Sequence, residues 1–321
     1  MRRDRFIKVL GATLAGACWS TWADSPPNRL SLLIPASAGG GWDATGRALG
    51  AAMLQTGRYR EVAYQNKGGA AGTLGLAQFL EQSVRDPNAL LVMGAVMVGG
   101  LVSSKSPLRL QQATPVARLT SEYSVFAVAA GSAFASMEDV ADALHESPTR
   151  VRFGGGSKGS TEHIATAMFA RSVHVAPRGL VYQPHAGGAE AVATLLRGGI
   201  DVVGSGYGEL APELASGRLR LLGISSQRRV PMLPMLPTLK EQGFDVIIGN
   251  WRGVYGAPGI SPAQRDALIA AVGEAVKQPA WRQAIERHGW TSSFTTGKDF
   301  GAFVEFEFAA MSAIMYLSGM L

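Results

Sequence analysis

Cysteine, charge and long apolar runs are all scarce in this 321-residue chain, and each shortage excludes a class of protein. The single cysteine, Cys18, allows no disulfide framework, and it lies so close to the N-terminus that a processed protein would have no thiol. Charged residues make up 17% of the chain and hydrophobic residues 47%. This balance excludes a disordered or coiled-coil protein and provides enough apolar residues for one large domain or two lobes.

Basic clusters and membrane spans are also missing. No group of lysines and arginines with interleaved aromatics occurs, so we expect no nucleic-acid binding. Beyond residue 23 no apolar run reaches the roughly 18 residues that cross a membrane. The run ALLVMGAVMVGGLV (Ala89–Val102) is broken by glycines and predicts a buried strand and turn. Residues 2–8 carry +3 of the formal net charge of +6, so the remainder is mildly basic, which suits a small anionic ligand.

The first residues have the order of an export signal. Four basic residues precede the apolar run Val9–Cys18, and the stretch Thr21–Ala23 places small residues before a cut after Ala23. We therefore expect residues 1–23 to be a signal peptide and the protein to be periplasmic. A buried first helix and a lipid anchor at Cys18, suggested by LAGAC, are the alternatives. RRDRFIK resembles a twin-arginine signal with Phe6 one place late, which leaves both export routes open.

Short apolar segments alternate with helical ones along the chain, which predicts parallel α/β architecture. The expected strands cover residues 29–36, 61–67, 89–95, 124–131, 201–210 and 219–226, and two more begin at 151 and 180. The expected helices cover residues 43–55, 70–82, 136–146 and 261–278. Two helix starts are marked by caps, namely Ser136 with Asp139 three residues later, and Ser261 followed by Pro262.

One unit recurs in this pattern: a strand, a glycine-rich turn and the N-terminus of a helix. Its four copies are Gly39–Asp43, Gly68–Gly72, Gly154–Thr161 and Gly187–Glu190. In open parallel sheets, ligands bind beyond the carboxyl ends of the strands. Helix N-termini there offer unpaired N–H groups and a partial positive charge. A single turn can be explained by backbone geometry alone, but four at strand ends predict a cleft for an anion.

Neither a nucleotide loop nor a catalytic set accompanies these turns. GGGWDATG lacks the Lys-Ser/Thr pair of a phosphate-binding loop, GGGSKGST has the wrong spacing, and the first turn lacks the third glycine of a dinucleotide fingerprint. There is no G-x-S-x-G elbow, and no histidine stands at metal-ligand spacing. His163 and His185 lie beside glycine turns. Each is expected to be either a ligand contact or a partly buried polar residue. We expect no catalysis, metal or cofactor; an α/β enzyme acting on a carboxylate is a rival.

Seven sequence blocks occur in the order found in a known family. They are IPASAGGGWDATGRALG, YQNKGGAAGTLG, FGGGSKGSTEHIA, YQPHAGGAEAVATLLRGGIDV, GRLRLLGISS, LPTLKEQGFDV and NWRGVYGAPGISPAQRDAL. From about Leu30 to Phe303 the chain resembles the periplasmic substrate-binding proteins of tripartite tricarboxylate transporters, the TctC group, which is close to the Bug proteins. The resemblance implies an α/β, two-lobed periplasmic binding fold of type II, with a hinged ligand cleft between the lobes.

The same resemblance implies a carboxylate ligand and delivery to the membrane components of a tripartite tricarboxylate transporter. Citrate is the leading candidate, and dicarboxylates, amino acids and aromatic acids are alternatives. A ligand-presenting role for a membrane sensor kinase is the other alternative. We expect the protein to be a monomer.

The family pattern also suggests lobes and site residues. One lobe would hold residues 24–122 and 250–321, including a C-terminal helix, and the other residues 123–249, with the hinge at these boundaries. Asp43 is expected to be a helix cap more than a ligand contact. Trp42 is expected to be either a wall of the cleft or a core residue. Arg252 is expected to be either the cation that contacts the ligand or one half of an interlobe ion pair. The full set of expected ligand-binding residues is Ala38, Gly39, Gly40, Gly41, Trp42, Asp43, Ser157, Ser160, Thr161, His163, His185, Gly187, Gly188, Gly206, Tyr207 and Arg252.

Overall fold

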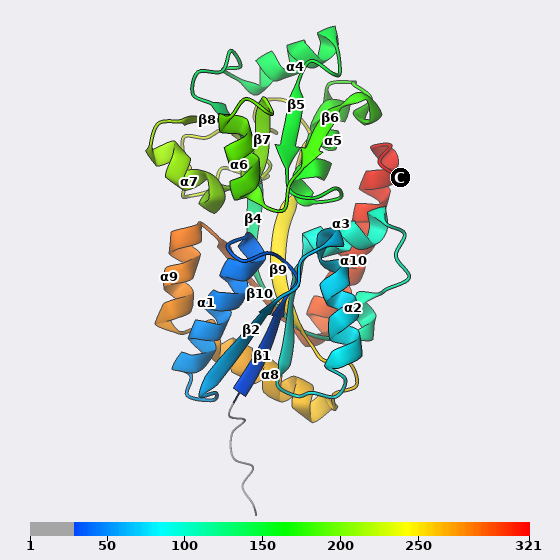
Figure 1. Ribbon diagram of the computed structural model, residues 1–321, viewed down its shortest axis with the longest axis vertical. Helices are drawn as coiled ribbons and strands as arrows, with labels where there is room; N and C mark the ends of the chain where they lie inside the picture. Colours follow the sequence, from blue (N-terminus) through cyan, green and yellow to red (C-terminus); the bar gives the residue numbers. More distant parts are fainter. Residues whose placement is uncertain (1–28) are drawn as a thin grey trace, which may run out of the picture.

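The computed structural model describes residues 29–321. The expected signal peptide, its cut after Ala23 and the possible anchor at Cys18 therefore lie outside the described residues. Ten strands pair in the order β2-β1-β3-β9-β4-β7-β5-β6, with β10 and β8 also pairing β4. The strands divide between two lobes stacked along the long axis of the molecule (Figure 1).

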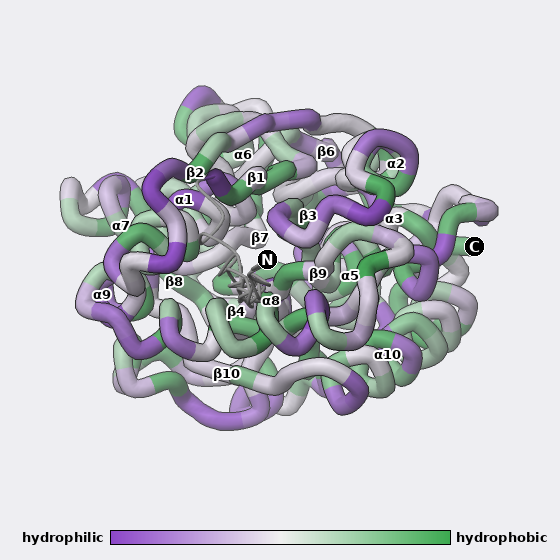
Figure 2. The backbone as a smooth tube through the Cα atoms, turned by 90° about the horizontal axis from the view of Figure 1, so that it is seen from below, coloured by the Kyte–Doolittle hydropathy of each residue, from purple (hydrophilic) through white to green (hydrophobic). Residues whose placement is uncertain are grey.

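The first lobe is built on a mixed sheet covered by helices. Its core strand β3 is buried at every residue, because it lies between β1 and β9; this explains its uninterrupted apolar run. In Figure 2, hydrophobic stretches of β1 and β9 lie toward the middle of the molecule. The elements are β1 (Arg29–Ile34), α1 (Gly41–Gln55), β2 (Glu61–Asn66), η1 (Ala70–Gly72), α2 (Thr73–Gln82), β3 (Ala89–Gly94), α3 (Ala95–Ser103), η2 (Leu110–Gln112), β9 (Gly249–Gly256), α8 (Pro262–Ala275), α9 (Pro279–His288), β10 (Thr291–Thr296) and α10 (Gly297–Leu317).

The second lobe repeats the strand, turn and helix unit on a smaller scale. Strand β5 pairs in parallel with both β6 and β7. The elements are α4 (Met137–Glu146), β5 (Arg152–Gly155), α5 (Thr161–Ser172), η3 (Pro177–Gly179), β6 (Val181–Pro184), α6 (Gly188–Leu196), β7 (Val202–Gly206), α7 (Tyr207–Ala215) and β8 (Leu219–Ile224). The expected caps at Ser136 and Ser261 are confirmed, since each hydroxyl accepts the N–H of the residue three positions later.

Strand β4 (Thr114–Ala129) runs through both lobes. Its first part pairs with β9 as far as Tyr123, opposite Gly249, and its second part pairs with β7 from Ser124. Glu122 and Asn250 are direct partners in this register. The two expected hinge segments thus lie side by side on neighbouring strands, and the lobe boundaries at 122–123 and 249–250 stay a prediction.

Three features differ from the sequence expectations. The sheet is mixed rather than purely parallel, because β9 pairs antiparallel with both β3 and β4. The expected turn after β3 is wrong, because Ala95–Ser103 forms the mostly buried helix α3. Its apolar residues on all sides suit a helix enclosed by protein. The strand expected over 201–210 ends at Gly206, and α7 begins at the next residue, Tyr207.

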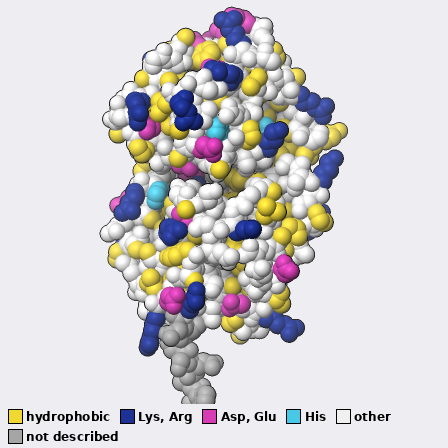
Figure 3. All heavy atoms as spheres, in the orientation of Figure 1, with side chains coloured by type: hydrophobic (Ala, Val, Ile, Leu, Met, Phe, Trp, Pro, Cys, Tyr) yellow, Lys and Arg dark blue, Asp and Glu magenta, His cyan; other side chains and the backbone are white. Residues whose placement is uncertain are grey.

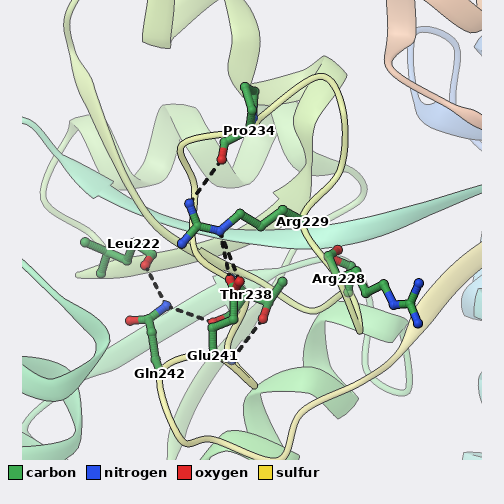
Figure 4. Close-up of polar contacts among 8 residues, drawn as sticks. Leu222, Arg228, Arg229, Pro234, Thr238, Glu241 and Gln242 are labelled. Carbon is green, nitrogen blue, oxygen red and sulfur yellow. Dashed lines mark hydrogen bonds and ion pairs between the residues drawn. The ribbon is translucent and has the colours of Figure 1, made fainter.

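The 24 residues between β8 and β9 contain no helix or named strand. Figure 4 shows the polar contacts that hold part of this segment. Arg229 Nε donates to both carboxylate oxygens of Glu241 at 3.0 and 3.1 Å, and its Nη1 donates to the Pro234 carbonyl at 3.1 Å. Glu241 also accepts the Thr238 N–H at 2.8 Å. The segment is therefore an ordered connection of the second lobe.

Helix α10 joins the lobes at a second place. By length and composition this helix could cross a membrane, but it packs against α3, β4, β10 and α5. Beyond its end, Arg178 of the second lobe donates to the carbonyls of Gly319 at 2.7 Å and Leu321 at 3.1 Å. The expected C-terminal helix of the first lobe thus reaches the second lobe.

Candidate functional site

A cavity of about 280 Å³ lies between the lobes, just below the 300–1,000 Å³ typical of small-molecule sites. All four glycine turns contribute to its lining, two from each lobe. Figure 3 shows acidic and histidine side chains beside the groove between the lobes. The size fits a small metabolite more readily than a nucleotide.

Nine of the sixteen expected binding residues line this cavity. Trp42 does so while being only 7% exposed, so it both walls the cavity and packs in the core. The nine are Gly40, Gly41, Trp42, Ser157, Ser160, His185, Gly187, Gly188 and Arg252.

The other seven expected residues lie outside the lining. Ala38, just before the first turn, and Gly39, its first residue, are exposed. Thr161 is fully buried. Gly206 is packed so closely that a Cβ there would lie 2.9 Å from Glu122 Oε1, and Tyr207 faces a different, small pocket. Asp43 and His163 complete the seven, and both have structural partners.

Asp43 is engaged in the fold of the first turn. Its Oδ2 accepts the Gly39 N–H and the Arg47 Nε, both at 2.9 Å, and its Oδ1 accepts from Asn66 at 2.9 Å. Although burial opposes it, these hydrogen bonds and the Arg47 charge lower the pKa of Asp43. Asp43 therefore fixes the first turn as a structural carboxylate and does not face the cavity.

The side chains of the two histidines contact other residues of the second lobe. The Gly159 N–H donates to His163 Nδ1 at 3.0 Å, and the ring packs on Tyr182 at 4.2 Å. Burial, reinforced by the Lys158 charge, lowers the pKa of His163 to about 4, so the ring is neutral at pH 7. Both ring nitrogens of His185 also have partners, the Gly155 carbonyl at 3.2 Å and the Thr194 hydroxyl at 3.1 Å. His185 thus has no ring nitrogen left for a ligand, whereas neutral His163 carries its proton on Nε2 but lies outside the cavity lining.

Arg252 stands where a cation was expected, and it is half of a buried ion pair. Its Nη2 donates to Glu122 Oε1, and the two side chains are only 5% and 9% exposed. Its guanidinium also lies over the Trp290 ring at 5.4 Å. A Cβ at Gly41 would lie 2.4 Å from Arg252 Nη2, so this glycine lets the guanidinium approach the start of α1. Glu122 and Arg252 both belong to the expected first lobe, so this pair is not the interlobe ion pair considered from the sequence, and the role of Arg252 as a ligand cation stays a prediction.

The Arg252 guanidinium is not saturated by this pair. Within residues 29–321 its Nε and Nη1, and the Asn250 Oδ1, are buried without a hydrogen-bond partner. Asn250 and Arg252 both line the cavity. Because buried polar groups without partners cost free energy, these atoms are suited to contact a bound molecule.

The helix starts that follow the two glycine turns of the first lobe lack side-chain caps. Gly40 precedes α1 and Gly72 precedes α2, and no side chain caps either helix. The first N–H groups of a helix have no acceptor inside the helix. The Thr73 N–H at the start of α2 already donates to the Ala70 carbonyl. The start of α1, with Arg252 beside it, therefore gives the first-lobe face of the cavity its positive potential.

Sequence reasoning missed the acidic residues of the site. Glu162 and Glu209 line the cavity, and Glu122 lies behind Arg252. Burial raises the pKa of Glu122 to about 7; Arg252 opposes this shift, and the charges of Glu209 and Glu162 add to it. A glutamate in the first turn of a helix is ordinarily a solvated partner of the helix dipole, so nothing local in GSTEH or GYGEL indicated burial.

Comparison with known proteins finds one matching family model and several similar proteins. The model of the tripartite tricarboxylate transporter family receptor, TctC, matches residues 52–319. Protein BugT of Bordetella pertussis is 25% identical over 327 aligned residues, which cover 99% of each chain. A ligand-free TctC solute binding protein from Polaromonas is 26% identical, with a TM-score of 0.68 over 92% of this chain and 99% of its own. MatC from Rhodopseudomonas palustris with bound malate shares the fold at 21% identity, with a TM-score of 0.77 over 89% and 98%.

Proposed function

Because this chain belongs to the TctC family of tripartite tricarboxylate transporter receptors, we propose that it captures a small carboxylate and delivers it to the membrane components of such a transporter. Members of the family are periplasmic binding proteins with a two-lobed fold that bind small carboxylates. For this chain we propose the same compartment, reached through the signal peptide in residues 1–23.

The observation that carries the proposal is the first-lobe face of the cavity. The N-terminus of α1, which no side chain caps, lies beside a buried guanidinium that has unused N–H groups, and the turn before α2 lines the same cavity. This combination is a strong recogniser of a carboxylate, since charge-assisted hydrogen bonds to Arg exceed neutral ones. We infer that a ligand carboxylate lies against the Gly40–Trp42 turn and Arg252.

The charge of the cavity bears on which carboxylate binds. Citrate was favoured from the sequence, but Glu162 and Glu209 add negative charge to the lining. Like charges brought together in a poorly solvated site cost free energy. We therefore propose a mono- or dicarboxylate ahead of the citrate trianion. The malate bound by MatC is of this class.

We propose a binding role without turnover. The cavity residues Ser157, Ser160 and His185 do not form a nucleophile with a free base, because both nitrogens of His185 have partners in the fold. The alternative is a sensory role, in which the ligand-bound protein binds a membrane sensor kinase. This role would use the same ligand site.

A melting-shift screen of the purified protein against mono-, di- and tricarboxylates, followed by calorimetry, tests the proposal. We expect at least one mono- or dicarboxylate to raise the melting temperature by binding the folded state, and citrate to bind more weakly. Absence of binding across the panel would contradict the carboxylate-receptor function. Tighter binding of citrate would leave that function intact and reverse the proposed preference.

A further inference from the structure

A groove of about 550 Å³ lies on the second lobe and shares no lining residue with the cavity between the lobes. One wall is formed by residues 219–221 of β8 and the other by Met232–Leu236 of the connection to β9; Ala130 and Leu214 complete the lining. We call it the β8 groove. Apart from Arg220 its lining is apolar, and Met235 is 84% exposed there. Flexible methionines are common at protein-binding surfaces because they adapt to a partner.

The β8 wall of the groove is an open edge of the sheet. Within residues 29–321, β8 pairs with β4 alone. The Arg218 carbonyl accepts the Ala130 N–H at 2.8 Å, and Arg220 is the next residue of β8 on the same side. Antiparallel strands bond to each other at every second residue. Leu219 and Leu221 therefore direct their N–H and C=O groups away from β4.

The chain itself covers the next part of this edge but not the part along the groove. The Ile224 N–H donates to the Pro237 carbonyl at 3.2 Å, and the Ile224 carbonyl accepts the Leu239 N–H at 2.9 Å. Among the described residues, no segment outside the sheet makes such a bond with Leu219 or Leu221. Open N–H and C=O groups of this kind are a template for a further strand.

The charge around the β8 groove favours an acidic occupant. Arg220 donates to backbone carbonyls, the nearest being that of Ala130 at 3.0 Å. In the described part of the chain, neither Arg220 nor Arg228 takes part in an ion pair. Glu213 and Glu241 are each paired with another arginine, and Arg228 points away from Glu241 in Figure 4. Positive charge therefore remains on both segments that form the groove, where a carboxylate can neutralise it.

The same features disfavour two other occupants. A second copy of this chain, added edge to edge about a twofold axis, would place Arg220 opposite Arg220 or Arg218 of the second copy, because Arg220 lies between the two open residues. Like charges directly opposite each other on neighbouring strands are destabilising. A lipid surface would leave the open N–H and C=O groups without partners, which is costly in an apolar medium.

We propose that the β8 groove binds an extended acidic segment of another protein, which pairs with β8 as an additional strand. The backbone of the segment bonds to Leu219 and Leu221, and a carboxylate of the segment lies opposite Arg220. Because side chains alternate along a strand, the residues before and after this carboxylate lie on the face of Leu219 and Leu221 and are apolar. The inference goes beyond the receptor function proposed above and does not depend on which ligand the cavity binds.

Amide NMR of the isotope-labelled protein with a short blocked peptide of central sequence Val-Glu-Val tests the proposal. We expect the largest shifts, and slower hydrogen exchange, at the Leu219 and Leu221 amides. Binding should be about tenfold tighter than that of a peptide with Val-Lys-Val, the gain typical of one charge-assisted contact. No change at these amides with millimolar peptide would overturn the docking site, as would a dimer that protects them without peptide. Equal affinities for the two peptides would overturn the acidic occupant.

Variants of the two kinds of contact locate the peptide. Met235→Ser removes an exposed apolar side chain from the groove and should weaken Val-Glu-Val binding roughly tenfold. Arg220→Gln should abolish the preference for Val-Glu-Val over Val-Lys-Val. Val84→Ser is the matched control, since Val84 is an exposed apolar residue of the first lobe, and it should change neither value. Parent-like binding and preference in both groove variants would overturn the assignment. If Arg220→Gln does not fold, the exposed Met235→Ser variant and the peptide pair still decide.

Discussion

The two faces of the cavity are built from the same unit, yet they present opposite chemistry. In the first lobe the turns before α1 and α2 leave helix N-termini uncapped, and Asp43 is turned away into contacts with Gly39, Arg47 and Asn66. In the second lobe the corresponding N–H groups are already taken, since Glu190 accepts from Ala186 and Glu209 from Gly188. A glycine turn before a helix therefore creates an anion site only where no side chain of the protein has filled it.

Removing the cation of the first-lobe face should have the largest effect. Arg252→Ala leaves Glu122 buried without its partner, which typically costs about 3–5 kcal/mol. We expect a loss of this size in urea unfolding at pH 8, and a smaller one at pH 5, where Glu122 can be neutral. The matched control Arg265→Ala removes a surface pair with Asp266 and should change stability by less than about 0.5 kcal/mol. Equal stabilities of the two variants would contradict a buried role for Arg252.

A methyl group on the second-lobe face should have the next largest effect. At Gly188 a Cβ would lie 2.0 Å from Ser205 Oγ and 2.2 Å from Glu209 Oε2, so Gly188→Ala must displace the Glu209 carboxylate. Overpacking of this kind costs about 1–3 kcal/mol. Its neighbour Gly187 is the control, because a Cβ there meets nothing closer than 3.8 Å. Thermal unfolding of Gly188→Ala and Gly187→Ala compares them, and similar melting temperatures would argue that Glu209 is not held in place.

Glu122, at the boundary of the two faces, should make the free energy of unfolding depend on pH. The pKa of Glu122 rises from 4.5 to about 7 in the folded protein, chiefly through burial. The folded state then binds a proton that the unfolded state releases, so this contribution is fully present below pH 4.5 and is lost as pH rises to about 7. Relative to Glu122→Gln, the parent should lose stability across this window in urea titrations. A parent that instead gains on the variant as pH rises would show that the Arg252 pair dominates and that the pKa of Glu122 is depressed.

Closure of the lobes should be the smallest of these changes. Expected hinges near Glu122–Tyr123 and Gly249–Asn250 lie opposite each other on β4 and β9, so a modest rotation at two paired strands brings the faces together. Small-angle scattering should show a slightly smaller radius of gyration with saturating ligand. An unchanged profile, with binding confirmed by calorimetry, would count against closure.

The features that sequence could predict are those set by local chemistry. Capped helix starts such as Ser261-Pro262 and the glycines of the four turns follow from backbone requirements within a few residues, and the nine expected residues that line the cavity come chiefly from those turns. Helix α3 was missed because a buried apolar run has no periodicity to distinguish helix from strand and turn.

The polarity of the cavity depends on contacts that no local pattern encodes. Arg252 and Glu122 are 130 positions apart and meet only because β9 pairs with the first part of β4. Glu209 reaches α6 from another helix. Burial of these carboxylates is a tertiary effect, since the same residues on an open helix end would be solvated.

A crystal structure of the protein with its tightest-binding ligand would show which face of the cavity holds the carboxylate. We expect a ligand carboxylate within hydrogen-bonding distance of the Gly40–Trp42 backbone and Arg252 on the first-lobe face. A carboxylate bound instead at the Ser157–Ser160 turn, with the first-lobe donors unused, would contradict it.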